Sequence, residues 1–181
     1  MANYKYSLIT EVINNSISDN WSEAVNEWSI VDSELDEELE SQCICGKENL
    51  KYLFTIRNDH NGKELKPIGS SCINKFERED LNESTGIYIE LYKLLSAFED
   101  KKYIELSSDL FSRKLIKYLY EDDCFEANEY NNYNPKNDHD FFLKMFNKRQ
   151  PMTDNQDRKV KAIIMNSIRP YLKQKLKVKQ H

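Results

Sequence analysis

Three cysteines in the central part of the chain constrain its fold more than any other feature. Cys43-Ile-Cys45-Gly46 has the form of a tight turn, and Cys72 follows 27 residues after Cys45, at the predicted start of a helix. Thiolates are soft ligands that suit tetrahedral zinc, and the amides at a helix N-terminus stabilise a thiolate. Gly46 allows the chain to turn back after the second cysteine. This spacing predicts a small metal site built from a turn, a hairpin and a helix. The alternative is three buried cysteines that act as small apolar side chains.

The segment between the cysteines predicts a β-hairpin. Residues 52–57 alternate between apolar and polar positions, as a half-buried strand does. Asn61-Gly62 is a strong turn signal, and residues 65–68 supply the return strand. Pro67 lacks a backbone N–H, which confines the return strand to the edge of a sheet.

Three cysteines are one ligand short of a closed structural zinc site. His60 lies in the predicted hairpin turn, and we expect it to be the fourth ligand, although an exposed turn histidine is the alternative for this residue. Cys124, a carboxylate such as Asp59 or Glu48, or an ordered water are the other candidates. The predicted ligand set for a structural Zn²⁺ is therefore Cys43, Cys45, Cys72 and His60.

The remaining sequence is helical in pattern. Residues 4–17 predict a first helix, and Trp21 to Trp28 predict a second helix with both tryptophans on its buried face. Thr153 to Gln156 form a capping box for the last helix, which Pro170 is expected to kink or end.

These patterns predict an α+β fold that is mostly α-helical, with a small central zinc-stabilised hairpin and helix. We divide the chain into an N-terminal helical arm (1–34), a zinc-binding module (35–80), a helical region (81–127) and a C-terminal helical region with a basic tail (128–181).

Composition limits the location and the class of the protein. The mean hydropathy is −0.78, and no run of 18 apolar residues exists, so we expect no membrane partner. The first residues lack the layout of a signal peptide, so we expect a cytoplasmic protein with reduced cysteines, in which metal binding is favoured over disulfides. The sequence contains no glycine-rich phosphate loop, no H-E-x-x-H and no G-x-S-x-G, and we expect no enzymatic activity.

The cysteine region resembles a known but uncharacterised module. Cys43-x-Cys45-Gly46, a short strand and Ile68-Gly69-Ser70-x-Cys72-Ile73-x-x-Phe76 look like a module in small proteins of bacteriophages, low-GC bacteria and large DNA viruses. The resemblance covers roughly residues 21–78. It implies a compact zinc-binding unit in a phage-type accessory protein, which places the protein in the host cytoplasm, and no catalytic residue carries over from it.

Charge is distributed unevenly along the chain. Residues 1–50 contain eleven acidic residues and two lysines, whereas residues 151–181 contain eight basic residues and two acidic ones. An acidic segment can occupy a basic groove on a nucleic-acid-handling protein. We therefore predict an inhibitor or adaptor of such a protein, for example a CRISPR-type host-defence nuclease, and we expect the groove-binding acids to be Asp36, Glu37, Glu38 and Glu40.

The alternative is a zinc-finger-like protein that binds nucleic acid directly. Tyr130 and Tyr133 lie in a polar loop and could stack on unpaired bases, or they could pack within that loop. The basic C-terminal region could hold a phosphate backbone through Arg158, Lys159, Lys161, Lys173 and Lys175.

Overall fold

The computed structural model describes residues 3–100 and 103–180 and confirms the predicted α+β, mostly helical fold. It contains a small antiparallel sheet of three strands in the order β1-β2-β3. The chain forms two compact units, one made of Met1–Tyr88 with Lys177–His181 and the other of Ile89–Leu176. We call them the sheet unit and the helical unit. The boundary between the predicted segments 81–127 and 128–181 falls inside the helical unit.

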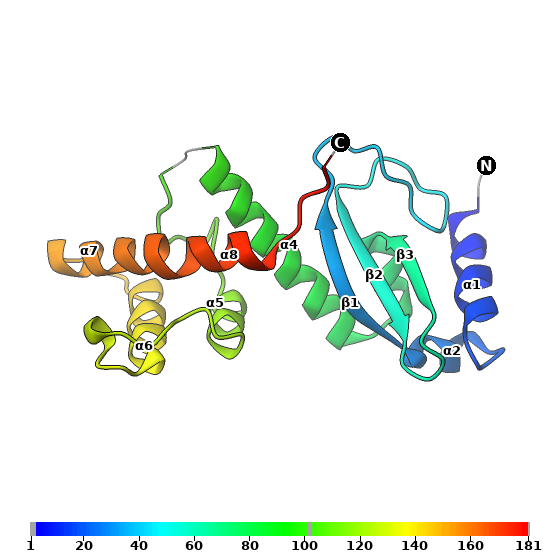
Figure 1. Cartoon of the computed structure of the whole chain (residues 1–181), viewed down its shortest axis with the longest axis horizontal. Helices are drawn as coiled ribbons and strands as arrows, with labels where there is room; N and C mark the ends of the chain where they lie inside the picture. Colours follow the sequence, from blue (N-terminus) through cyan, green and yellow to red (C-terminus); the bar gives the residue numbers. More distant parts are fainter. Residues whose placement is uncertain (1–2, 101–102, 181) are drawn as a thin grey trace. The chain divides into compact units, whose positions relative to one another are not determined.

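The sheet unit contains the sheet, the three cysteines Cys43, Cys45 and Cys72, and the first helices of the chain (Figure 1). Its elements in chain order are α1 (Tyr4–Asn15), α2 (Trp21–Ala24), the 3₁₀ turn η1 (Val25–Glu27), β1 (Trp28–Leu35), β2 (Tyr52–Asn58), β3 (Glu64–Ile68), α3 (Ser70–Ile73), the 3₁₀ turn η2 (Asn74–Phe76) and the first part of α4 (Glu79–Glu99).

The predicted hairpin is present as β2 and β3. Its turn contains Gly62 with a φ of 74°, a conformation that favours glycine, and the Asn58 amide donates to the Lys63 carbonyl at 2.8 Å. Pro67 lies in β3, the edge strand of the sheet, as its missing N–H requires. On one face of the hairpin Phe54 meets Tyr88 of α4, with ring centroids 6.4 Å apart.

The predicted helix from Trp21 to Trp28 is wrong in its second half. The helix ends at Ala24, and Trp28 begins β1, which pairs with β2 along its whole length. Trp28 is fully buried, and its indole N–H donates to the Ser16 hydroxyl at 2.9 Å. The tryptophan therefore belongs to the core as predicted, but it reaches the core from a strand.

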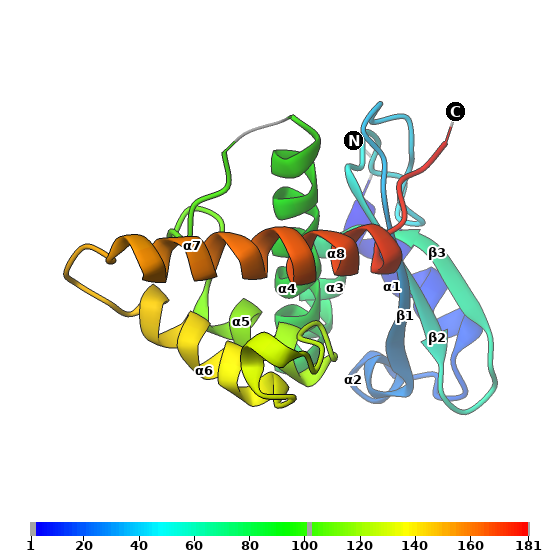
Figure 2. The same ribbon diagram turned by 60° about the vertical axis from the view of Figure 1, so that its left-hand side comes forward.

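The helical unit holds the end of α4 and the later helices (Figure 2). α7 and α8 follow each other as one continuous helical rod in both ribbon views, with α6 beside it. The remaining elements are α5 (Arg113–Glu121), the 3₁₀ turn η3 (Glu129–Asn131), α6 (Pro135–Phe146), α7 (Asp154–Ile163), the π-helical turn η4 (Ile164–Ile168) and α8 (Arg169–Lys175).

Pro170 neither ends nor breaks this helical rod. The predicted capping box of α7 is present, with Thr153 and Gln156 bonded to each other's backbone amides. The chain then widens into the π-helical turn, in which the Arg169 amide donates to the Ile164 carbonyl. A π-helical turn is one way in which a helix accommodates a residue that cannot join the regular hydrogen-bond ladder.

The end of the chain returns to the sheet unit. Leu35 of β1 donates to the Lys177 carbonyl at 2.9 Å, and the Lys179 amide donates to the Leu35 carbonyl at 2.8 Å. These bonds place Val178 in a parallel bridge with Leu35. The tail thus covers part of the otherwise open edge of β1. No helix in the described ranges is long and apolar enough to cross a membrane.

The buried carboxylate of Glu27 connects the segment that follows α1 to the end of β2. Glu27 accepts hydrogen bonds from the backbone amides of Ile17 and Ser18, both at 2.8 Å, and from the Asn58 side-chain amide at 2.7 Å. Burial alone would raise the pKa of Glu27, but these three donors together lower it below 4.5. Asn58 in turn orders the hairpin turn by accepting from the His60 amide at 2.9 Å.

We predict that Glu27→Gln destabilises the sheet unit by about 1–3 kcal/mol at pH 7, because a side-chain NH₂ would face one of the three donors. A lowered folded-state pKa means that the carboxylate stabilises the fold above the unfolded-state pKa and that this stabilisation is lost as the pH falls through the folded-state pKa. Urea unfolding at pH 7 and at an acidic pH below the folded-state pKa of Glu27 measures both effects, and the loss caused by Glu27→Gln should shrink at the lower pH. Glu11→Gln, at an exposed position of α1, is the control. Equal unfolding midpoints for both variants at pH 7 would contradict the assignment.

Candidate metal centre and acidic loop

The first two cysteines lie on a closed turn in the β1–β2 loop. The Gly46 amide donates to the Cys43 carbonyl at 2.7 Å, and the Cys43 amide donates to the Lys47 carbonyl at 2.8 Å. Gly46 has a φ of 93°, a conformation that L side chains rarely adopt, so the role predicted for this glycine is present. This turn directs the thiols of Cys43 and Cys45 to the same side.

The third cysteine comes from the element that follows the hairpin. Gly69 leaves β3 in an extended conformation and acts as the N-cap of α3, where its carbonyl accepts from the Cys72 amide at 3.0 Å. The Ile44 amide donates to the Pro67 carbonyl at 2.9 Å, and this bond fixes the cysteine turn against the end of β3. The turn, the strand end and the helix start therefore meet at one point.

The three thiols form a buried cluster. Cys72 Sγ lies 3.7 Å from Cys43 Sγ and 3.2 Å from Cys45 Sγ, and the cysteines are only 4%, 3% and 2% exposed in chain order. These separations exceed a disulfide bond of about 2.05 Å. A tetrahedral ion with Zn–S bonds of about 2.3 Å would set its thiolates roughly 3.8 Å apart. The cluster is thus placed to hold a metal ion.

The surroundings favour a thiolate at Cys43. The hydrogen bond from Cys72 lowers the pKa of Cys43 most, the amides of Cys45 and Gly69 add to this effect, and the resulting pKa is about 5 despite burial. The same bond, with burial, raises the pKa of Cys72. A thiolate is the form that binds a metal ion, so one ligand is already prepared at neutral pH.

The structure does not bring His60 to the thiols, which corrects its assignment as the fourth ligand. His60 lies in the β2–β3 turn beside Glu27, whereas the thiols lie at the other end of the hairpin next to Gly69. The five residues of β3 alone span roughly 16 Å at about 3.3 Å per residue. An antiparallel hairpin necessarily places its turn and its open end apart.

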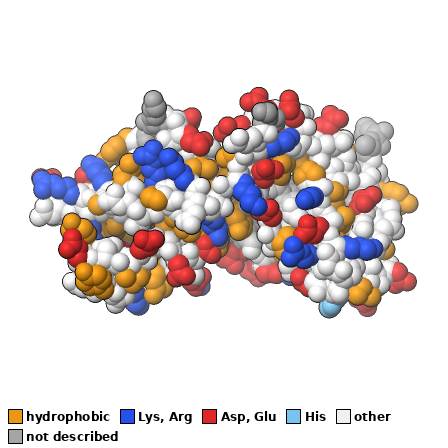
Figure 3. Space-filling model, viewed as in Figure 1, with side chains coloured by type: hydrophobic (Ala, Val, Ile, Leu, Met, Phe, Trp, Pro, Cys, Tyr) orange, Lys and Arg blue, Asp and Glu red, His pale blue; other side chains and the backbone are white. Residues whose placement is uncertain are grey.

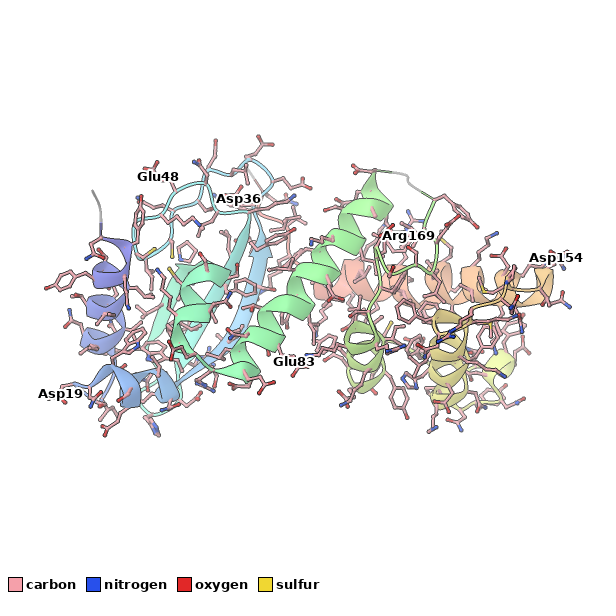
Figure 4. All side chains as sticks on the ribbon, turned by 180° about the vertical axis from the view of Figure 1, so that it is seen from behind. Asp19, Asp36, Glu48, Glu83, Asp154 and Arg169 are labelled. Carbon is pink, nitrogen blue, oxygen red and sulfur yellow. The ribbon has the colours of Figure 1, made fainter. Side chains whose placement is uncertain are left out.

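The other candidates for the fourth ligand also lie outside the cluster. Asp59 shares the turn of His60 and accepts from the Ser29 hydroxyl at 2.6 Å. Glu48 lies exposed on the loop after the cysteine turn (Figure 4), and Cys124 is buried in the helical unit. Within residues 3–100 and 103–180, no fourth cysteine, histidine or carboxylate has its ligand atom within 4.8 Å of all three thiols.

The acidic part of the same loop is anchored by a buried carboxylate. Asp36 is fully buried and accepts from both the amide and the hydroxyl of Ser41, at 2.9 and 2.5 Å, while Lys179 of the tail lies 3.4 Å away. Burial raises the pKa of Asp36, but the Ser41 and Lys179 interactions lower it to about 2. Asp36 is therefore an internal anchor, and its predicted place among the exposed groove-binding acids is corrected. Spacing alone gave no signal for this network.

Three exposed acidic residues lie between Asp36 and Ser41. Glu37, Glu38 and Glu40 are exposed, and Leu39 between them has a φ of 59° and is also exposed. Figure 3 shows acidic side chains gathered over the β1–β2 loop of the sheet unit. We call residues 37–40 the acidic loop.

The basic residues considered for nucleic-acid binding are partly neutralised. Lys159 lies 3.4 Å from Asp138, Lys161 lies 2.5 Å from Asp157, and Lys175 lies 2.6 Å from Asp122. Arg158 and Lys173 are exposed. The tyrosines of the polar loop do not pack within it, since Tyr130 and Tyr133 are 82% and 73% exposed.

Comparisons of the chain with protein-family models, with curated proteins and with solved structures found no match.

We predict that Cys43→Ser, Cys45→Ser and Cys72→Ser each remove the bound metal ion and lower the stability of the sheet unit, because the cysteine turn and the start of α3 are joined through the thiols. Elemental mass spectrometry of purified protein, with thiol titration before and after chelation, measures the effect. One ion per chain and three protected thiols are expected for the wild type.

Two matched variants test whether His60 or Cys124 contributes to the metal site. His60→Ala and Cys124→Ala should each keep one ion per chain, since neither side chain belongs to the thiol cluster. Loss of the ion from His60→Ala would restore the histidine as a ligand. A Cys43→Ser protein with unchanged metal content and stability would rule out the site.

Proposed function

We propose that the protein is a non-enzymatic accessory protein that presents the acidic loop to a basic groove of a nucleic-acid-handling protein and thereby modulates or inhibits it. A CRISPR-type host-defence nuclease is the partner class that we favour. The observation that carries this proposal is the exposure of Glu37, Glu38 and Glu40 on a loop that is anchored on both sides.

Anchoring matters because a loop that is already ordered loses little conformational entropy when it binds. Asp36 precedes the acidic loop and Ser41 follows it, and the hydrogen bonds between these two residues close the loop at its base. Beyond Ser41 the chain enters the cysteine turn. The Leu50 amide donates to the Ser41 carbonyl at 3.0 Å and closes the loop across the thiol cluster. A row of carboxylates held in this way can compete with a phosphate backbone for a basic groove and gains fast association from its charge.

We further propose that the ion is Zn²⁺ and that its role is structural. Zinc accepts thiolate ligands in tetrahedral geometry, and the 3.7 Å between the Cys43 and Cys72 sulfurs fits such a site, whereas the 3.2 Å between the Cys72 and Cys45 sulfurs would widen on binding. The β1–β2 loop contains no named helix or strand in the described structure, so the ion would supply much of its order. The segment from Cys43 to Phe76 resembles the phage-type cysteine module, and this resemblance supports the expectation of a structural zinc ion.

A second candidate function is direct nucleic-acid binding. The observation in its favour is the exposure of Tyr130 and Tyr133, whose rings could stack on unpaired bases. The ion pairs of Lys159, Lys161 and Lys175 weigh against it, because a lysine already paired with a carboxylate contributes less to phosphate binding.

We predict that the triple variant Glu37→Gln, Glu38→Gln, Glu40→Gln loses inhibition of its partner by about tenfold or more while it stays folded, because these exposed side chains lie outside the core. The measurement is DNA cleavage by a panel of CRISPR-type nucleases at several salt concentrations, with added wild-type or variant protein. Inhibition by the wild type should weaken as the salt concentration rises.

The matched control neutralises three exposed acids of the helical unit, Glu105→Gln, Asp109→Asn and Glu126→Gln, and should leave inhibition intact. Undiminished inhibition by the acidic-loop variant would refute the proposed role of this loop. Fluorescence anisotropy with single-stranded DNA and RNA tests the second candidate. Tight binding with a steep salt dependence, lost on Tyr130→Ala and Tyr133→Ala, would favour direct nucleic-acid binding instead.

A further inference from the structure

The helical unit contains an apolar pocket that the proposed function does not use. Its volume is about 330 Å³, within the size range of small-ligand sites. Two of its lining side chains, Tyr103 and Met165, are 61% and 46% exposed, so the pocket opens to solvent. The pocket is lined by Phe98, Tyr103, Ile104, Lys161, Ile164, Met165 and Arg169.

A cationic group with an unsatisfied donor lines this apolar pocket. The Nε atom of Arg169, whose side chain Figure 4 labels, is buried and has no hydrogen-bond partner within residues 3–100 and 103–180. Its guanidinium carbon lies 5.9 Å from the Phe98 ring centroid. A buried N–H of a charged group without an acceptor is costly, and such groups in folded proteins are usually satisfied. The natural acceptor for a guanidinium is a carboxylate, which can take the Nε–H and a terminal N–H together.

The backbone at this place is also irregular. Ile164, Met165 and Arg169 lie in or directly after the π-helical turn, in which the Arg169 amide reaches back to the Ile164 carbonyl. Single π-helical turns within α-helices occur frequently at functional sites. The turn changes the direction in which the following side chains leave the helix, so it places Arg169 on the pocket together with Ile164.

A second cation lies at the same pocket. Lys161 stands one turn before η4, with its ammonium group 5.1 Å from the Tyr103 ring centroid and paired with Asp157. Asp157 is not among the residues that line the pocket. Because Asp157 already neutralises Lys161, the charge that the pocket offers to a ligand comes from Arg169, while Phe98, Ile104 and Ile164 supply an apolar wall.

We propose that this pocket binds a small organic carboxylate with an apolar body, such as an aryl-substituted short-chain acid. The carboxylate would accept from Arg169 Nε–H, and the apolar body would lie against Phe98, Ile104 and Ile164. The exposed Met165 side chain lines the site and can adapt its conformation to the ligand.

The test is a titration of ¹⁵N-labelled full-length protein with 3-phenylpropionate, followed through the side-chain Nε–Hε signal of Arg169. A saturable shift of this signal is expected. Two analogues separate the parts of the ligand: 3-phenyl-1-propanol keeps the ring without the charge, and acetate keeps the charge without the ring. Both should bind at least about tenfold more weakly than the acid.

Variants give an independent readout by calorimetry. Arg169→Gln should weaken binding at least about tenfold, and Met165→Trp should abolish it by filling the pocket. Arg158→Gln, an exposed arginine of α7 outside the pocket, should bind as the wild type does. Thermal unfolding of each free variant shows whether it is folded.

Two results would overturn the inference. One is the absence of a saturable shift of the wild-type Arg169 signal up to about 10 mM acid, a reading that needs no variant to fold. The other is equal affinity for the acid and the alcohol, which would reduce the pocket to an apolar cavity without anion recognition.

Discussion

The meeting of the cysteine turn with the end of β3 is the contact on which the sheet unit depends. A loop of this length without helix or strand needs fixed points, because its backbone polar groups cannot satisfy each other in a regular ladder. The Ile44 bond to Pro67 and the three thiols provide these points on one side, and Asp36 with Ser41 provides one on the other. The exposed position of the acidic loop rests on this closure, and so does the role that we propose for it.

The features that the sequence predicted correctly are those set by neighbouring residues. Gly46 and Asn61-Gly62 need backbone conformations that few other residues adopt, and Pro67 cannot sit in a central strand, so each specifies its own local geometry. The capping box from Thr153 to Gln156 is local in the same sense. The three cysteines could be grouped from sequence because a turn, a hairpin and a helix start return the chain to one place.

The features that the sequence missed depend on distant parts of the chain. β1 escaped detection because a bulge between Ile30 and Asp32 interrupts its alternation, and because the helical spacing of Trp21 and Trp28 suggested another pattern. His60 was assigned by sequence proximity, whereas the hairpin carries it to the opposite end from the thiols. Asp36 looked like one more exposed acid, and its burial against Ser41 and Lys179, the latter far along the chain, makes it an internal anchor.

The uneven charge of the sequence is partly cancelled inside the fold, and this determines which charges are left to act on a partner. Lys177 pairs with Asp32 and Lys179 with Asp36, so the basic tail neutralises acids of β1 and of its end. The exposed pair adds little stability, whereas the Lys179 charge helps keep a fully buried carboxylate ionised. The tail is therefore part of the scaffold under the acidic loop. A partner that bound the lysines of the tail would pull the tail from the edge of β1 and weaken the Asp36 anchor of the acidic loop. Binding of nucleic acid by the tail lysines and binding of a basic protein groove by the acidic loop would therefore exclude each other.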